Sequence, residues 1–300
     1  MASMGKIAEP GTFLLDYRPP YRFGALLSFL QARQLEGVEK IDGSAYRRTV
    51  RIPAGGCEAL GWLRVENDPS ANALKVTVSA SLEPAIPAIA QRLRRQFDTE
   101  IDPAAIAAGL APLEEAVPGA LVAGTRLPGC FDPFETACRA ILGQQVSVAA
   151  ACKLAARIAE AYGTPVETGI GGLGLAFPTA AEIAAMEPLE DALGPLGVIK
   201  SRSRCIAQIA RMLLEGELDF APDADVPRQM ERLLAIKGIG PWTAGYIAMR
   251  VFGYPDAFLE TDAGIKHALP GLAPRQRLEL AEGWRPWRSY ATIGLWNSLG

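Results

Sequence analysis

The feature that most constrains the fold is a change of hydrophobic period about one third of the way along the 300 residues. In the first hundred residues, four segments alternate apolar and polar positions over strand lengths: TFLLDY, AYRRTVRI, GWLRVE and ALKVTVSA. Two others, FGALLSFLQARQ and AIPAIAQRLRRQF, repeat apolar residues three and four positions apart, as amphipathic helices do. Residues 1–104 are therefore predicted to form an α+β domain, an antiparallel sheet backed by two helices.

From about residue 104 to the end, the period is helical throughout. Segments such as ACRAILGQQVSVAAACKLAARIAEAY and KSRSRCIAQIARMLLEG are separated by short connectors that contain Gly, Pro, Asp or Thr, the residues that start and stop helices. One connector, GIGGLG at residues 169–174, matches a dinucleotide fingerprint by letter. No strand precedes it and no helix opens on its last glycine, so we predict only a glycine-rich loop. The chain is expected to be mostly α.

Composition excludes several kinds of site. The cysteines are odd in number, widely spaced and without a C-x-x-C pair, which argues against disulfides, zinc and iron-sulfur clusters; they are Cys57, Cys130, Cys138, Cys152 and Cys205. The single histidine, His267, excludes multi-histidine metal centres and is expected on a helix surface. Because the chain has neither an 18-residue apolar run nor a basic-then-apolar leader, we expect a cytoplasmic protein with no membrane partner.

Charge allows a small nucleic-acid footprint. The net charge of −3 argues weakly against such a partner, but residues 237–300 carry seven lysines and arginines against five acidic residues. That positive balance suits a local phosphate contact.

The stretch LLAIKGIGPWTAGYIAMRV, residues 233–251, reads as helix, tight turn and helix. Gly238 and Gly240 permit positive φ and leave backbone amides uncovered, while Pro241 is suited to start the second helix, with Thr243 in its first turn. A helix N-terminus with free amides favours an anion. The alternative is a purely structural turn that buries Ile239.

At these residues the chain resembles the helix-hairpin-helix DNA glycosylases, whose signature is L-P-G-I-G-x-W/K-T-A followed by an aspartate. AIKGIGPWTAGY supplies the hairpin, with Lys237 where proline is usual, and FLETDAGIKHAL supplies Asp262. RLPGCFDPFETACRAILGQQVSVAAACKLAAR and GWRPWRSYATIGLW extend the resemblance to the bacterial DNA-3-methyladenine glycosylase II family. The implied fold has two helical subdomains flanking a cleft. One contains residues 105–131 and 255–300 and the catalytic aspartate, and the other contains residues 132–254 and the hairpin.

The resemblance implies that Asp262 is the catalytic carboxylate, which stabilises positive charge at the sugar C1′ or orients water. Taken alone, Asp262 reads equally well as a helix N-cap after Thr261. Relatives that also cut the strand carry a lysine at position 242. Here Trp242 stands in its place and cannot form a Schiff base, so a monofunctional enzyme without lyase activity is expected.

The resemblance also assigns the base cleft and the DNA contacts. Trp242, Tyr246 and Trp296 would stack on electron-poor alkylated bases, although Tyr246 and Trp296 could instead pack in the core. Trp284 and Trp287 are expected to be structural.

Gln145 is the implied wedge that fills the gap left by the flipped nucleotide; its alternative is an ordinary polar helix residue. The amides of Gly238, Gly240 and Thr243 would hold phosphates. The carbonyls of Leu234, Ile236 and Ile239 would bind a structural Na⁺ or K⁺.

These features predict a monofunctional glycosylase that flips and excises alkylated bases, such as 3-methyladenine and 7-methylguanine, from double-stranded DNA. It would start base excision repair as a monomer and need no cofactor. Two alternatives stay open. A non-catalytic helix-hairpin-helix DNA-binding module would need neither Asp262 nor the aromatic cleft. A glycosylase for other damaged or deaminated bases would keep the fold, but the usual markers of those for oxidised or mismatched bases, a hairpin lysine or a four-cysteine cluster, are missing.

Overall fold

The computed structural model describes residues 7–9, 11–54 and 56–299. Its N-terminal part is a six-stranded antiparallel sheet with the order β1-β2-β6-β5-β4-β3. The strands are β1 (Ile7–Glu9), β2 (Thr12–Asp16), β3 (Glu39–Asp42), β4 (Ala45–Ala54), β5 (Cys57–Asp68) and β6 (Ala73–Val78). The predicted antiparallel sheet is confirmed. Sequence reasoning missed β1 and β3 because three or four residues carry too little alternation to stand out.

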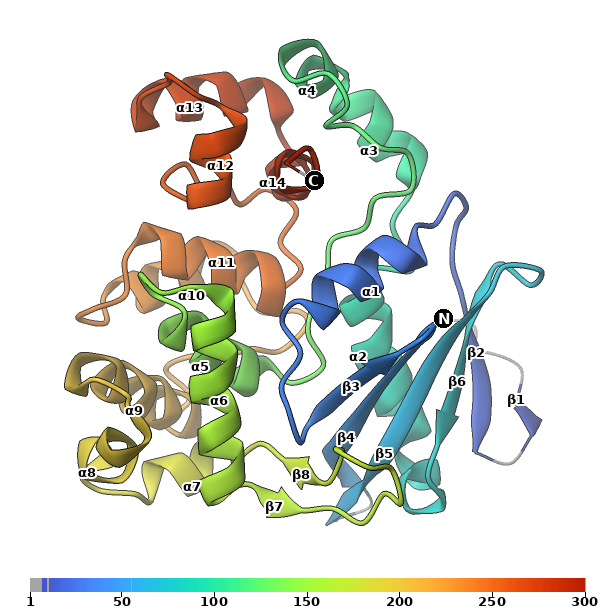
Figure 1. Ribbon diagram of the computed structural model, residues 1–300, viewed down its shortest axis with the longest axis vertical. Coiled ribbons are helices and arrows are strands. Elements are labelled where there is room, and N and C mark those ends of the chain that lie inside the picture. The colour runs from blue at the N-terminus through green and yellow to red at the C-terminus, as the bar shows by residue number, and fades with distance from the viewer. Residues whose placement is uncertain (1–6, 10, 55, 300) are drawn as a thin grey trace.

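Two helices, α1 (Phe23–Gln31) and α2 (Ile86–Phe97), pack against this sheet, as predicted (Figure 1). A 3₁₀ turn, η1 (Ala80–Ala85), leads from β6 into α2. Their apolar faces and the inward side chains of the strands form one buried cluster, which includes Leu15, Leu27, Leu63, Val76, Leu93 and Phe97.

The rest of the chain is helical. The helices are α3 (Pro103–Gly109), α4 (Ala111–Ala116), α5 (Pro133–Leu142), α6 (Val148–Tyr162), α7 (Ala180–Ala184), α8 (Leu189–Leu193), α9 (Lys200–Leu214), α10 (Val226–Leu234), α11 (Pro241–Val251), α12 (Ala263–Ala268), α13 (Pro274–Ala281) and α14 (Arg288–Asn297), with 3₁₀ turns η2 (Gly194–Leu196) and η3 (Glu282–Trp284). Two further buried clusters hold them. One is centred on α5, α6, α9 and α11, and the other on α3, α4, α12 and α14.

The stretch 137–162, which has a helical period throughout, is interrupted in the structure. Helix α5 ends at Leu142, and α6 begins at Val148 after Ser147, whose hydroxyl accepts a hydrogen bond from the amide of Ala150 at 3.2 Å. Between them lies a turn in which Gln145 has a φ of +55°. A glycine followed by a capping serine offers the backbone an alternative to continued helix, and that local choice outweighs the apolar period.

The GIGGLG loop at residues 169–174 is a turn between two short strands, so no helix follows it and the dinucleotide reading fails as expected. It contacts the N-terminal sheet. Lys40 Nζ donates to the carbonyl of Gly171 at 2.7 Å, and the amide of Leu175 donates to the carbonyl of Gly37 at 2.9 Å. The expectation that no strands follow residue 104 is wrong to this extent: a two-residue ladder closes the loop, formed by β7 (Thr164–Pro165) and β8 (Leu175–Ala176).

Buried ion pairs join the sheet to the helical part. Arg48 of β4 contacts Glu135 of α5 at 2.8 Å, and Arg139 contacts both Glu135 at 2.8 Å and Glu39 of β3 at 3.0 Å. The hydroxyl of Tyr46 donates to Glu39 at 2.7 Å. We call these five residues the interdomain ion cluster. It fixes α5, and with it the turn that follows, against the N-terminal sheet.

Within the parts of the chain that the structure describes, no helix is long and apolar enough to cross a membrane.

Candidate active site

The hairpin has the predicted local structure. Helix α10 ends at Leu234, and Pro241 opens α11 after Gly240 as its N-cap. Gly238 has a φ of +100°, and a Cβ there would lie 2.7 Å from the Cys205 sulfur, so the position requires glycine. Ile239 is buried beneath the turn.

The amides of Gly238, Gly240 and Thr243 donate to no acceptor in the described part of the chain. They therefore stand free at a helix N-terminus, where the dipole favours an anion.

A glutamine that the sequence did not single out links the hairpin to the α5–α6 turn. Gln144 Nε2 donates to the carbonyl of Gly238 at 2.9 Å and to the Thr243 hydroxyl at 3.0 Å. On its other side, the carbonyl of Gln144 accepts a hydrogen bond from the Arg202 guanidinium of α9. The turn and the hairpin are therefore held in a fixed relation.

Gln145 projects from that turn. Its side chain is exposed, and it is followed by two exposed valines, Val146 and Val148. The alternative that Gln145 is an ordinary helix residue is wrong, because its backbone is left-handed. Gln145 lines one open groove of about 830 Å³ together with Gly238, Gly240 and Asp262. Sequence positions about a hundred residues apart thus meet along one surface.

Of the two interpretations of Asp262, the structure confirms the helix N-cap. Asp262 is the N-cap of α12, and its Oδ1 accepts hydrogen bonds from the amides of Gly264 at 2.8 Å and Ile265 at 3.2 Å. The same carboxylate also accepts two indole hydrogen bonds, from Trp296 Nε1 to Oδ1 at 2.8 Å and from Trp242 Nε1 to Oδ2 at 3.0 Å. Capping and indole donors together fix the direction of the carboxylate plane.

Gly264 makes this arrangement sterically possible. A Cβ there would lie 2.6 Å from Cδ1 and 2.9 Å from Nε1 of the Trp296 indole, so any side chain would displace the ring from Asp262. Sequence reasoning missed this role because the motif AGIKHAL gives no sign of what packs against it.

Two aromatic stacks run inward from Asp262. Trp242 lies on Tyr246 with ring centroids 5.2 Å apart and planes 14° apart. Trp296 lies on Phe29 at 6.2 Å and 17°. Phe29 belongs to α1, so a ring of the N-terminal domain packs against the Trp296 indole, which the sequence did not indicate.

The stacks end at arginines. Arg250 donates from NH1 to the Tyr246 hydroxyl at 2.8 Å, and its guanidinium lies 4.9 Å from the Phe29 ring centroid. Arg33, one turn after Phe29, lies over the same ring at 3.8 Å. Burial opposes ionisation of the Tyr246 hydroxyl, but Arg250 and Arg33 outweigh it and lower its pKa.

These groups enclose a cavity of about 410 Å³, large enough for a purine ring. Its wall includes Arg33, Arg139, Trp242, Tyr246, Arg250, Asp262 and Trp296. The three aromatic residues predicted for the base cleft and the predicted catalytic aspartate therefore border one space. Trp284 is fully buried and Trp287 packs against Gly109, so both lie outside it.

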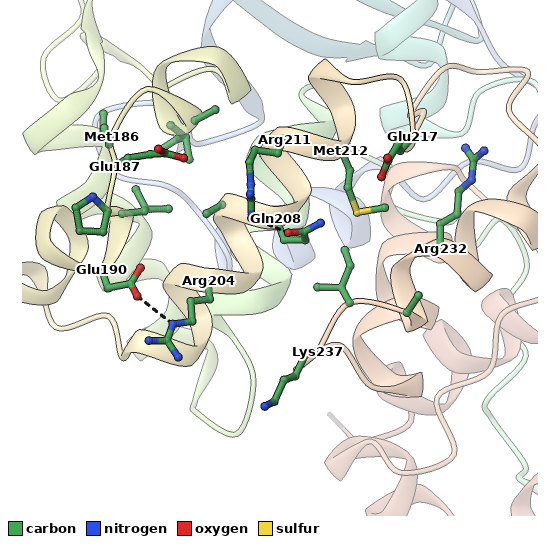
Figure 2. Close-up of a pocket in the computed structure, with 17 residues that line it drawn as sticks. Met186, Glu187, Glu190, Arg204, Gln208, Arg211, Met212, Glu217, Arg232 and Lys237 are labelled. Atoms are coloured by element: carbon green, nitrogen blue, oxygen red, sulfur yellow. Dashed lines mark hydrogen bonds and ion pairs between the residues drawn. The ribbon is translucent and has the colours of Figure 1, made fainter.

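A larger cavity, about 850 Å³, lies on the other side of the hairpin between α7, α8, α9 and α10 (Figure 2). Figure 2 shows charged side chains around it together with Gln208, Met186 and Met212, and Arg204 there is paired with Glu190 at 2.9 Å. None of its lining residues is aromatic, so it has no surface on which a base could stack. Lys237 belongs to this second cavity and not to the one that contains Asp262.

Over residues 7–9, 11–54 and 56–299, no three His, Cys, Asp or Glu side chains gather as a metal site would require. His267 is exposed on α12, as predicted.

Two family models match the chain. Residues 12–132 match the AlkA N-terminal domain, and residues 138–275 match the HhH-GPD superfamily base excision DNA repair protein. DNA-3-methyladenine glycosylase 2 of Escherichia coli K12 is 38% identical over 288 residues, which cover 96% of this chain and 98% of that protein. The probable bifunctional transcriptional activator/DNA repair enzyme AlkA of Mycobacterium tuberculosis is 38% identical over 291 residues, 95% of this chain and 56% of that protein.

Among solved structures, the 3-methyladenine DNA-glycosylase from Archaeoglobus fulgidus superimposes with a TM-score of 0.76. The identity is 20%, and the match covers 95% of this chain and 97% of that one. At this identity the likeness concerns the fold, and it confirms the predicted class: an N-terminal antiparallel-sheet domain followed by a helical helix-hairpin-helix glycosylase fold.

Proposed function

The chain belongs to the HhH-GPD superfamily of base excision DNA repair proteins, and from that premise we propose that it excises alkylated bases from DNA as an AlkA-type glycosylase. The observation that carries this proposal is the Asp262 carboxylate, held between the indoles of Trp242 and Trp296 at the edge of a base-sized cavity. A DNA-binding module without catalysis has no use for that arrangement.

The reaction breaks the bond between the base nitrogen and C1′ of the sugar. As the base leaves with the bonding electrons, positive charge develops at C1′ and the ring oxygen, and a carboxylate beside it lowers the energy of that state. Asp262 is oriented for this role before substrate arrives, because four N–H donors fix its two oxygens. Water then adds to C1′, and Asp262 accepts its proton.

We further propose that the enzyme leaves the strand intact. Cleavage by β-elimination would need an amine that attacks C1′ to form an iminium. Trp242 occupies the hairpin position from which the family's lysine acts, and its nitrogen is already engaged with Asp262 at 3.0 Å. Lys237 lines the other cavity. The product would therefore be a free base and an abasic site.

The DNA contacts follow from the hairpin and the turn beside it. The free amides of Gly238, Gly240 and Thr243 would bind phosphates of the strand that carries the lesion. Gln145, exposed at the edge of the same groove, would enter the base stack where the nucleotide has left. Gln144 supports both, since it ties the turn to the hairpin.

A monovalent cation suits the back of the hairpin. The carbonyls of Leu234 and Ile239 accept no hydrogen bond in the described structure, and that of Ile236 accepts one from Ile239. Leu234 is the last residue of α10 and Ile236 follows it closely, and the dipole at a helix C-terminus favours a cation. We propose that Na⁺ or K⁺ binds there and supplies a positive charge beside the phosphate.

We also propose the three-part division in which residues 105–131 and 255–300 form one subdomain and 132–254 the other, acting as a monomer on double-stranded DNA. The two helical clusters support that division, although Ala248 and Met249 of α11 pack into the first subdomain.

The test compares wild type with Asp262→Asn on methylated duplex DNA. Asparagine keeps an acceptor for the amides of Gly264 and Ile265, so the N-cap and the fold are retained. We expect release of 3-methyladenine and 7-methylguanine, measured by chromatography under single-turnover conditions, to fall by about 10² to 10³. Affinity for a duplex with an abasic-site analogue should change little.

Glu260→Gln is the matched control, because it removes the same charge from the same groove without touching an indole. An equal loss of base release in both variants would mean that any negative charge in the groove has the same effect as the Asp262 carboxylate. A wild type that binds the duplex and releases no base would favour the binding-module alternative.

A further inference from the structure

Three arginines line the base cavity, and one of them, Arg33, comes from the N-terminal domain. Arg33 of the segment after α1 lines the cavity that contains Asp262. Its guanidinium donates to the carbonyl of Phe29 at 3.3 Å, lies over the Phe29 ring at 3.8 Å and interacts with the Tyr246 side chain. Within the described structure no carboxylate pairs with it.

The other two arginines of the wall are already engaged. Arg139 pairs with Glu39 and Glu135, and Arg250 donates to the carbonyls of Pro128 and Gly129 and to the Tyr246 hydroxyl. A guanidinium has five N–H donors, and the two groups that Arg33 meets do not use them all. Arg33 is therefore the arginine of this wall best able to donate to a ligand.

The geometry fixes which part of a base Arg33 would meet. The two aromatic stacks both begin at Asp262, at Trp242 and Trp296, and both end at Arg33 and Arg250. A base whose C1′ lies at Asp262 and whose ring lies between the stacks presents its opposite edge to the arginines. In a purine, that edge carries the substituent at position 6.

We propose that Arg33 is a specificity-determining residue that donates a hydrogen bond to an exocyclic oxygen on the far edge of the flipped base. This inference rests on the proposed glycosylase function and adds a preference within it. Bases with an acceptor at that edge gain a charge-assisted hydrogen bond. Bases with an amino group there gain none, and a cationic base additionally meets the unneutralised charge of Arg33.

The test is the ratio of two excision rates. Hypoxanthine is neutral and carries an oxygen at position 6, whereas 3-methyladenine is excised from a cationic nucleotide and carries an amino group there. Arg33→Met keeps an unbranched chain over Phe29 but removes the charge and every donor. We expect single-turnover hypoxanthine release to fall about 10- to 100-fold and 3-methyladenine release to change less than about 3-fold.

A second readout measures the free base directly. Quenching of the Trp242 and Trp296 fluorescence by hypoxanthine should occur with wild type and weaken at least about 10-fold with Arg33→Met. Arg22→Met is the matched control, since Arg22 is exposed at the start of α1 and lies outside this cavity. It should behave as wild type in both assays.

Equal loss of both excision rates with unchanged hypoxanthine binding would overturn the proposal, because it would mean that Arg33 only supports the pocket. If circular dichroism shows Arg33→Met to be unfolded, Arg33→Gln takes its place, with the same expected direction and the same overturning result. A wild type that excises neither base but binds hypoxanthine through Arg33 would contradict the proposed function alone.

Discussion

Two groups of arginines meet where the N-terminal sheet contacts the helices, and they differ in one respect. In the interdomain ion cluster, Arg48 and Arg139 are paired with the buried carboxylates Glu135 and Glu39 at 2.8 to 3.0 Å. A few residues away along the chain, Arg33 faces the base cavity with no carboxylate partner in the described structure. The same side chain type thus occurs neutralised and unneutralised in one interface.

The difference appears in the pKa values. Burial alone lowers the pKa of a guanidinium, and for Arg33 it prevails. Burial acts on Arg48 too, but the combined attraction of Glu135, Tyr46, Glu39 and Asp132 outweighs it and raises the pKa of Arg48. A buried ion pair stabilises one arrangement of the two domains. An arginine without a carboxylate partner can instead interact electrostatically with a bound ligand. The first cluster is therefore expected to govern stability and the second to govern selectivity.

The largest effect should come from breaking the paired cluster. Glu135→Ala leaves Arg48 buried without its carboxylate, and Arg139 loses one of two partners. We expect a loss of about 3–5 kcal/mol in the free energy of unfolding, measured by urea denaturation. Glu58→Ala is the control: Glu58 pairs with Arg51 but is 43% exposed, so its loss should stay below about 1 kcal/mol.

Similar losses in these two variants would remove the distinction between buried and exposed pairs on which the comparison rests. Glu135→Gln, which keeps a hydrogen-bonding oxygen for Arg48, should fall between them.

The division between predictable and unpredictable residues follows the same contrast. Gly238 and Gly240 could be found in the sequence because the turn depends on local backbone geometry, whereas Trp242 and Asp262 were singled out by the resemblance of their motifs to a known family. The strands and the helices of the hairpin were likewise predictable from hydrophobic period. A short motif carries the information for a turn or a cap within itself.

Phe29, Arg33 and Gln144 were not predictable, because each acquires its role from a distant segment. Phe29 meets Trp296 across more than 260 residues of sequence, and nothing in FGALLSFLQAR distinguishes a ring that packs against a distant indole from one in the core. Gln145 was singled out in the sequence, but its turn was hidden within a helical pattern, where only the Gly-to-Ser spacing hinted at a break.

Asp98 is a buried carboxylic acid that forms no ion pair with an arginine in the described structure, and it tests the contrast between paired and unpaired buried charges. Asp98 Oδ2 accepts hydrogen bonds from the amide of Leu127 at 2.9 Å and the Tyr290 hydroxyl at 2.8 Å. Burial raises the pKa of Asp98 to about 7. Glu39 is buried too, but Arg139 and Arg48 overcome the same penalty and lower its pKa.

Because the folded state holds the Asp98 proton more tightly than the unfolded state, its contribution to stability is largest below about pH 4 and is lost as the pH rises toward 7. Asp98→Asn retains an acceptor for both donors and tolerates the left-handed backbone. Relative to wild type, this variant should gain on the order of 3 kcal/mol between pH 4 and pH 8 in urea denaturation.

Asp68→Asn is the control of opposite sign. Asp68 is exposed, and hydrogen bonds with Ser70 and Ala71 lower its pKa. Its contribution is present above the unfolded-state pKa and lost in acid, so this variant should not gain stability as the pH rises. A flat difference between Asp98→Asn and wild type would mean that Asp98 is ionised in the folded protein throughout.

The smallest effect concerns Tyr246, whose pKa depends on the arginines at the inner end of the cavity. Burial raises the pKa of Tyr21, Tyr46 and Tyr290, whereas Arg250 and Arg33 reverse that tendency at Tyr246 and lower its pKa. In a titration followed by phenolate absorbance, one signal should appear below the ordinary value of about 10. Tyr246→Phe should remove it at a cost of only about 1 kcal/mol of stability, since one hydrogen bond from Arg250 is lost.

The control for that titration is the charge itself. Arg33→Met removes one of the three arginines, Arg250, Arg33 and Arg139, that favour the Tyr246 phenolate, so the early signal should move upward in that variant. Glu58→Ala, far from the cavity wall, should leave it in place. If the signal persists in Tyr246→Phe, it belongs to another tyrosine. If it is present but insensitive to Arg33→Met, the lowered pKa of Tyr246 comes from Arg250 and Arg139, and Arg33 does not contribute the charge that the comparison assigns to it.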